Sequence, residues 1–149
     1  FLAATGARVS ELLQLKVEHV IAGHLDLYSK GGKLRRLYIP VTLQTEAKVW
    51  LSECGRSSGY LFLNRFGKRI SPRGITHQIK HFAKKYGIPT EVVYPHSFRH
   101  RFAKNFLEHL SDIALLADLM GHESIETTRI YLRRTATEQR QIVDEVIIW

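Results

Sequence analysis

The sequence predicts an α+β fold that is mostly α-helical and contains one small antiparallel sheet of three strands. Over most of the chain, apolar residues recur every three or four positions, which is typical of amphipathic helices. Residues 25–39 instead alternate apolar and polar residues around a Gly-Gly pair, as the two strands of a hairpin do. The length of 149 residues allows one hydrophobic core, so we expect a single domain over residues 1–149.

The first forty residues predict two helical pieces and the sheet. Phe1–Ala4 resembles the last turns of an apolar helix that Gly6 breaks, and residues 9–15 form the next helix. Residues 25–39 form the hairpin, with Val20–Ile21 expected as the third strand. The chain thus begins with helix, followed by its only sheet.

The rest of the chain predicts helices, and three of them end at a glycine: Gly55, Gly87 and Gly121. We expect them at residues 42–54, 72–86, 96–107, 113–120 and 125–132, with a terminal apolar segment at 142–149. The lone Cys54 excludes an intramolecular disulfide and a cysteine zinc site, and we expect it to be a buried structural residue.

Charge and hydropathy limit the function. The chain has 22 Lys+Arg against 14 Asp+Glu and a formal net charge of +8, which indicates an anionic partner. With 44% hydrophobic residues it is not a disordered chain. No apolar run approaches the ~20 residues of a membrane helix, and no signal peptide is recognisable. We therefore expect a cytoplasmic protein without a membrane partner.

Arg8 and Arg99 are the candidate phosphate-binding residues. A guanidinium is always charged, and its planar fork matches two phosphate oxygens. Arg8 follows Thr5-Gly6-Ala7 near a helix junction. His96 precedes Arg99 by three residues, so on a helix the two side chains share a face and can contact one ligand. The alternative is that each arginine is an ordinary surface or capping residue.

His122 and Tyr131 lie nine residues apart, on either side of a helix start at Ser124. A phenol, with a pKa of about 10, is a poor nucleophile unless cations and hydrogen bonds favour the phenolate. Tyr131 has cationic neighbours in sequence, among them Arg129 and Arg133. The alternative is an ordinary tyrosine on an amphipathic helix.

No cofactor and no metal are expected. The pairs His77/His81 and His96/His100 have the spacing of metal ligands on a helix, but neither encloses a glutamate and no cysteine or carboxylate cluster completes a site. Neither a phosphate-binding GxxxxGK[ST] loop nor a GxGxxG dinucleotide motif is present. These absences point away from nucleotide-driven or metal-dependent chemistry.

Five short motifs, in this order, resemble those of the tyrosine recombinase (phage integrase) family. They are Thr5-Gly6-Ala7-Arg8-Val9-Ser10-Glu11-Leu12, Ser29-Lys30-Gly31-Gly32-Lys33, His96-Ser97-Phe98-Arg99-His100, Leu119-Met120-Gly121-His122-Glu123-Ser124 and Thr127-Thr128-Arg129-Ile130-Tyr131. The resemblance runs from Leu2 to about Arg134, and the order and spacing of all five motifs make it specific.

The resemblance implies a phosphoryl transfer on double-stranded DNA. Tyr131 would attack the scissile phosphate, forming a 3′-phosphotyrosyl link and releasing a 5′-hydroxyl. Arg8 and Arg99 would bind the non-bridging oxygens, and His122 would donate a further hydrogen bond to them. Because the covalent link retains the bond energy, neither ATP nor a metal is needed.

The resemblance also implies roles for three further residues. Lys30, favoured over Lys33 on the same turn, would protonate the leaving 5′-oxygen. His96 would assist proton transfer or orient the phosphate, and Glu11 would support the first arginine. A larger basic set is expected to contact DNA phosphates: Arg35, Arg36, Arg65, Lys68, Arg69, Arg73, Lys80, Lys84 and Lys85.

The two ends of the chain carry separate expectations. The apolar segment that includes Ile142 and Val146 either covers the core of its own domain or docks on a neighbouring protomer, as in the tetramers of the family. By the same resemblance, residues 1–149 are a catalytic domain that lacks the core-binding domain and its own first helix. The alternatives are a DNA-binding remnant that does not recombine and a nicking-closing enzyme similar to type IB topoisomerases.

Overall fold

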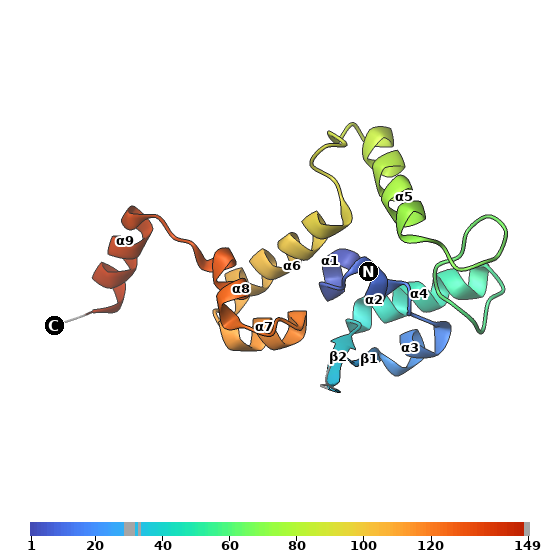
Figure 1. Cartoon of the computed structure of the whole chain (residues 1–149), viewed down its shortest axis with the longest axis horizontal. Helices are drawn as coiled ribbons and strands as arrows, with labels where there is room; N and C mark the ends of the chain where they lie inside the picture. The colour runs from blue at the N-terminus through green and yellow to red at the C-terminus, as the bar shows by residue number, and fades with distance from the viewer. Residues whose placement is uncertain (29–31, 33, 148–149) are drawn as a thin grey trace.

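The computed structural model describes residues 1–28, 32 and 34–147, and it is mostly helical with one small sheet (Figure 1). The elements are α1 (Leu2–Thr5), α2 (Val9–Leu12), α3 (Val17–Ala22), β1 (His24–Tyr28), β2 (Leu34–Tyr38), α4 (Val41–Glu53), α5 (Pro72–Lys85), α6 (Pro95–His109), α7 (Ile113–Met120), α8 (Ile125–Arg129), the 3-10 helix η1 (Ile130–Leu132) and α9 (Ala136–Val146). The predicted α+β class is therefore confirmed. Within these ranges, no helix has the length and apolar character needed to span a bilayer.

Strands β1 and β2 pair as the predicted antiparallel hairpin, with Leu25 opposite Leu37 and Tyr28 opposite Leu34. Leu25, Leu27 and Leu37 are buried, whereas Tyr28 is exposed. The alternation of apolar and polar residues thus buries one face of the hairpin in the core and leaves the other to solvent.

The third strand expected at Val20–Ile21 is wrong, because both residues lie in α3. Val17 and Val20, three residues apart, are buried, whereas Ile21 is 62% exposed, as on a helix packed along one side. Gly23 ends this helix with a φ of 81° and turns the chain directly into β1. In the part of the chain that the structure describes, the sheet has two strands.

The helices expected over 42–54, 72–86, 96–107 and 113–120 are present within about two residues of these bounds, and the terminal helix α9 begins earlier than the segment expected at 142–149. The helix expected over 125–132 is α-helical only to Arg129 and continues as the 3-10 turn η1. The expectation for Cys54 is wrong, because its side chain is exposed. Cys54 is the C-terminal cap of α4, and the buried face of that helix ends at Leu51.

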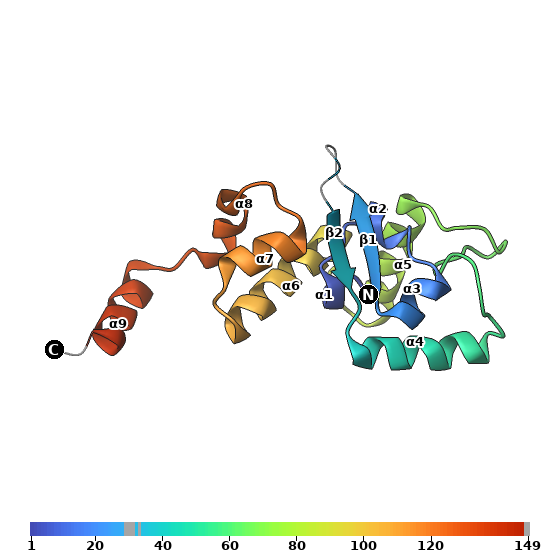
Figure 2. The same ribbon diagram turned by 90° about the horizontal axis from the view of Figure 1, so that it is seen from below.

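The buried apolar residues form two clusters rather than the single expected core. The larger cluster contains buried residues from all five helices α1 through α5 and from both strands of the hairpin. The smaller cluster consists of Ala103, Leu116 and Met120, and Phe102 and Tyr131 are among the residues packed against it. Helix α6 connects the two clusters, because it also carries Phe98, which packs against the larger one. Figure 2 shows the same division, with α6, α7 and α8 beside the hairpin and α1.

Helix α9 lies apart from both clusters, at the end of an extended connection from η1 (Figures 1 and 2). Thr135 and Glu138 cap its N-terminus with reciprocal hydrogen bonds. No residue of α9 is buried, and its apolar residues Val143 and Val146 are exposed. Of the two alternatives for this segment, covering the core of its own domain is therefore not observed.

Leu116→Ala tests the smaller cluster. Leu116 is fully buried at the centre of this cluster, so the substitution should lower the free energy of unfolding by about 2–5 kcal/mol. Leu115→Ala, on the same helix at a 40% exposed position, is the matched control and should cost much less. Urea denaturation of both variants measures the difference, and equal losses would contradict the assigned packing.

Candidate active site

Arg99 is the most deeply buried charged residue of the site. It lies on the second turn of α6 and is 2% exposed. Its Nη1 donates to the Gly6 carbonyl and its Nη2 donates to the Met120 carbonyl, 2.5 Å away. Both carbonyls stand at helix C-termini, where backbone acceptors have no partner within the helix. Arg99 therefore joins the end of α1 to the end of α7.

The pKa of Arg99 reflects this position. Burial lowers it to about 10, and the positive charges of Arg8 and Arg35 act in the same direction. The guanidinium still carries its charge at neutral pH. The three guanidinium groups lie close to one another, because Arg35, Arg99 and Arg8 reach the consecutive carbonyls of residues 119, 120 and 121.

Two glycines shape the backbone around these arginines. Gly6 has a φ of 62°, and a Cβ there would lie 2.5 Å from the ring of Phe102. Gly121 has a φ of 64°, and a Cβ there would lie 2.4 Å from Cδ of Arg35. Only glycine combines this left-handed backbone with such close approach. The two turns therefore bring Arg99 and Arg35 against the backbone.

Arg8 occupies the N-cap position of α2, and its side chain is 46% exposed. The carboxylate of Glu11 accepts two hydrogen bonds from Arg8, one from the backbone N–H at 2.7 Å and one from Nη1 at 3.0 Å. Nη2 of Arg8 lies 3.5 Å from the Gly121 carbonyl. Arg8 is thus oriented by the protein but remains accessible to an external anion.

Arg35 is buried rather than free to contact DNA, so the expectation that it binds a phosphate at the surface is not supported. Its side chain is 10% exposed; Nη1 pairs with Glu11 at 2.5 Å and Nε donates to the Leu119 carbonyl at 2.9 Å. Nη2 is buried and has no hydrogen-bond partner among the described residues. Arg35 connects β2 to α2 and α7.

Glu11 is the carboxylate at the centre of this cluster. Burial by itself would raise its pKa, but the hydrogen bonds from Arg35 and the Arg8 amide, with their charges, hold the pKa below its ordinary value. Glu11 is therefore ionised at neutral pH. One carboxylate among Arg8, Arg35 and Arg99 leaves an excess of positive charge, which suits an anionic ligand.

His122 follows the glycine that ends α7, and its backbone N–H donates to the Ala117 carbonyl at 2.9 Å. Its ring nitrogen Nδ1 forms a hydrogen bond of 2.7 Å with Oγ1 of Thr128. Thr128, on α8, is fully buried. The imidazole is therefore held between α7 and α8.

The electrostatics keep His122 neutral. Burial lowers its pKa to about 4, and the charges of Arg99, Arg8, Arg35 and His96 contribute in that order. A neutral imidazole next to several cations can donate a single hydrogen bond without adding a further positive charge. His122 therefore lies within the field of the three arginines.

Tyr131 lies on η1 and is half-buried against the smaller cluster, which includes Leu116 and Met120. Its ring meets His100 edge-on, with 5.3 Å between ring centroids and an angle of 66°. Helix α6 thus contacts Tyr131 through His100.

Burial raises the pKa of Tyr131, and the charge of Arg99 opposes this increase. The phenol is therefore protonated at neutral pH. The cation that favours its phenolate is Arg99, rather than the sequence neighbours expected to do so. Arg129, one of those neighbours, pairs instead with Glu126 at 3.0 Å.

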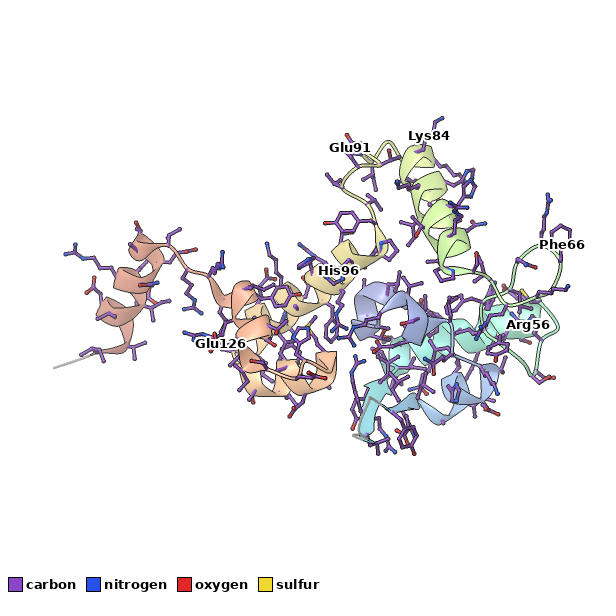
Figure 3. The ribbon with its side chains drawn as sticks, viewed as in Figure 1. Arg56, Phe66, Lys84, Glu91, His96 and Glu126 are labelled. Atoms are coloured by element: carbon purple, nitrogen blue, oxygen red, sulfur yellow. The ribbon has the colours of Figure 1, made fainter. Side chains whose placement is uncertain are left out.

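His96 is exposed on the first turn of α6, close to α1 (Figure 3). Its ring meets His100 edge-on at 4.8 Å between centroids, so the rings of His96, His100 and Tyr131 form a row. Burial lowers the pKa of His96, and His100, Arg99 and Arg8 add to this effect. His96 is neutral at neutral pH and can accept a proton.

Five of the six predicted site residues thus lie around one cluster: Arg8, His96, Arg99, His122 and Tyr131. Lys30 lies outside the described residues. Among residues 1–28, 32 and 34–147, no group of three histidine, cysteine or acidic side chains is arranged to hold a metal ion.

Thr128 and His100 contact site residues, although the sequence predicts no role for either. Arg35, predicted to contact DNA at the surface, pairs instead with Glu11. Thr128 and His100 lie inside the motifs, beside Thr127 and Arg99, so their motif positions were the available signal. No sequence signal distinguishes Arg35 from its neighbour Arg36, which is exposed and pairs with Asp26 at 2.7 Å. Only the packing of β2 distinguishes the two.

The pKa of His122 predicts a pH dependence of stability. The pKa is about 4 in the folded chain and about 6.5 in an unfolded one, so between these values the unfolded chain binds a proton that the folded chain does not. Stability should therefore fall as pH falls from about 6.5 toward 4. In His122→Gln this slope should be shallower.

Urea denaturation at a series of pH values between 7 and 4 measures the two slopes. His77→Gln removes an exposed histidine of α5 and should leave the slope of the original chain. A His122→Gln slope equal to that of the original chain would show that His122 is not held neutral.

Comparison with known proteins places the chain in a family. Residues 1–138 match the model of the phage integrase family. The tyrosine recombinase XerA of Pyrococcus furiosus is 40% identical over 149 residues, which cover 96% of this chain and 51% of that protein. The chain spans about half the length of the curated relatives it matches.

Solved structures are similar over nearly the whole chain. The crystal structure of XerA recombinase has a TM-score of 0.79 and 28% identity, covering 99% of this chain and 56% of that one. The XerH site-specific recombinase bound to its difH substrate, in a pre-cleavage complex, has a TM-score of 0.75 and 25% identity, covering 96% and 44%. The family resemblance predicted from the five motifs is thereby confirmed, and the chain belongs to the phage integrase family of tyrosine recombinases.

Proposed function

We propose that this chain carries the catalytic site of a site-specific recombinase, which cleaves and rejoins DNA strands through a 3′-phosphotyrosyl intermediate. The observation that carries the proposal is the convergence of Arg8, Arg99 and neutral His122 with the phenol of Tyr131 in one positively charged cluster. Such a cluster suits a phosphate that gains negative charge during the reaction. Because the chain spans about half the length of its relatives, the recombination activity of a whole protein is proposed and not observed.

Arg8 and Arg99 would bind the non-bridging oxygens of the scissile phosphate. A guanidinium has five N–H donors, and the two backbone carbonyls use only two of those of Arg99. Arg8 is exposed and oriented by Glu11, so it can meet the phosphate from the solvent side. His122 would donate one further hydrogen bond, from the ring nitrogen that does not contact Thr128.

The attack forms a bond from Oη of Tyr131 to phosphorus and breaks the bond to the 5′-oxygen. Tyr131 is a neutral phenol, so its proton must leave as the bond forms. His96 is exposed and neutral, and we assign it the acceptance or relay of this proton. Lys30 would protonate the leaving 5′-oxygen, and a 5′-hydroxyl of a second strand would reverse the step.

Double-stranded DNA is the proposed partner. The net charge of +8 favours a polyanion, and such binding should weaken steeply with salt. Lys84 extends from the end of α5, away from His96, and is one of the basic residues proposed to contact DNA phosphates (Figure 3). The solved XerH structure contains the difH substrate of that protein. DNA in the cytoplasm would be the substrate.

Tyr131→Phe tests the proposed chemistry. The substitution keeps the packed ring and removes the nucleophilic oxygen, so a covalent protein–DNA complex on a nicked suicide duplex should fall by at least about 1000-fold. Tyr86→Phe, at a 68% exposed position next to α5, is the matched control and should cleave normally. Denaturing gels detect the covalent complex.

The alternatives have different outcomes in the same assay. Salt-sensitive DNA binding by the original chain without any covalent complex would indicate a remnant that binds DNA and would contradict the proposal. Relaxation of supercoiled DNA without exchange between two duplexes would indicate a nicking-closing enzyme.

We also propose that α9 docks on a neighbouring protomer and supports a homotetramer on DNA. The helix is capped and amphipathic, yet none of its residues is buried within its own chain. Val143 and Val146 are 56% and 68% exposed. An exposed apolar stripe on an isolated helix is stabilised by burial against a partner, and a second copy of the chain is the partner we assign.

Deleting residues 139–149 tests this docking. The deletion should reduce higher-order complexes on DNA by about 10-fold or more, while the free energy of unfolding of the remaining domain changes little. Val146→Asp should act in the same direction, and Gln141→Asp on the same helix is its control. Native gels and denaturation measure the two effects. Unchanged assembly with a weakened fold would contradict docking in trans.

A further inference from the structure

We propose that Thr128 is a positioning residue that holds His122 as the tautomer with its proton on Nε2. The hydroxyl of Thr128 donates to Nδ1, which leaves Nε2–H as the one donor that the neutral ring can offer to a phosphate. The inference rests on the proposed function, because it concerns the hydrogen bond that His122 would give to the scissile phosphate.

The hydrogen bond between Thr128 and His122 is short, and the Thr128 hydroxyl is shielded from solvent. Oγ1 of Thr128 lies 2.7 Å from Nδ1 of His122, and Thr128 has no exposed surface. In the described part of the chain, His122 is the only hydrogen-bond partner of this hydroxyl. If the hydroxyl accepted a proton from Nδ1, its own hydrogen would be buried without a partner, which is unfavourable. Donation by Thr128 satisfies both groups.

The tautomer matters because the ring is neutral. A protonated imidazole carries N–H on both nitrogens, whereas a neutral one carries a single N–H, and the hydrogen bond at one nitrogen selects which. Burial and the charges of Arg99 and Arg8 favour the neutral form of His122. The opposite tautomer would present a lone pair from Nε2 to the phosphate oxygens and would repel them.

The position of Thr128 also relates two parts of the site. Thr128 lies on α8 three residues before Tyr131, and His122 lies before α8, directly after the turn that ends α7. One side-chain hydrogen bond therefore connects the loop of the phosphate-binding imidazole with the segment of the nucleophile. Thr127, the adjacent residue, is exposed and has no such contact in the described structure.

Three variants separate this role from simple packing. Thr128→Val keeps the shape of the side chain and removes the hydroxyl, Thr128→Ser keeps the hydroxyl and removes a methyl group, and Thr127→Val is the matched control. We expect covalent complex formation on the nicked duplex to slow about 10-fold in Thr128→Val. We expect it to stay within about twofold of the original rate in Thr128→Ser and Thr127→Val.

Nitrogen-15 NMR of the histidine rings reads the tautomer directly, without DNA or catalysis. His122→Gln identifies the His122 signals among the eight histidines. At pH 7 the original chain and Thr128→Ser should show a protonated Nε2 and an unprotonated Nδ1. In Thr128→Val the two nitrogens should shift toward averaged values. Denaturation of each variant establishes that it is folded.

The results distinguish the inference from the function on which it rests. A protonated Nδ1 in the original chain, an unchanged tautomer in Thr128→Val, a rate in Thr128→Val equal to the original, or no rescue by Thr128→Ser would overturn the role of Thr128. If Tyr131→Phe abolishes the covalent complex in the same experiments, the proposed function still stands. If the original chain forms no covalent complex, the proposed function fails, and the NMR measurement alone decides the tautomer.

Discussion

The hydrogen bonds of buried Arg99 are the interaction on which the rest of the structure depends. A buried charge is unfavourable unless its donors are satisfied. Arg99 finds its acceptors at the C-terminal ends of α1 and α7, at Gly6 and Met120, where carbonyls would otherwise lack partners. Because α1 packs on the larger cluster and α7 on the smaller one, a single guanidinium joins the two halves of the molecule at the site.

This arrangement orients the arginines of the site through hydrogen bonds within the protein. Glu11 holds Arg8 on one side and Arg35 on the other, and Arg35 also bonds to Leu119 on α7. The same side chains that stabilise the junction therefore fix the direction of the exposed guanidinium. Burial lowers the pKa of Arg99, and repulsion from Arg8 and Arg35 lowers it further. This excess positive charge suits an anionic ligand.

The residues with recognisable local chemistry could be predicted from the sequence, and those defined only by packing could not. Arg8, Arg99 and His122 adjoin glycine or proline signals that mark helix ends, and the structure brings them together. Val20–Ile21 has the apolar character of a strand, yet α3 is decided by burial of Val20 beside Val17. Thr128 and Arg35 look like ordinary surface residues until the contacts of α8 and β2 with α7 are known.

The neutral state of His122 follows from the same electrostatics. In the empty site, four neighbouring positive or protonatable groups and burial disfavour its proton, so the ring offers one hydrogen bond without increasing the repulsion. In the proposed reaction, a bound phosphate would offset part of this positive charge and would raise the pKa of His122 toward its ordinary value. The hydrogen bond to the phosphate would then strengthen as negative charge accumulates on its oxygens. Stabilisation of this kind grows along the reaction coordinate and therefore lowers the barrier rather than only tightening binding.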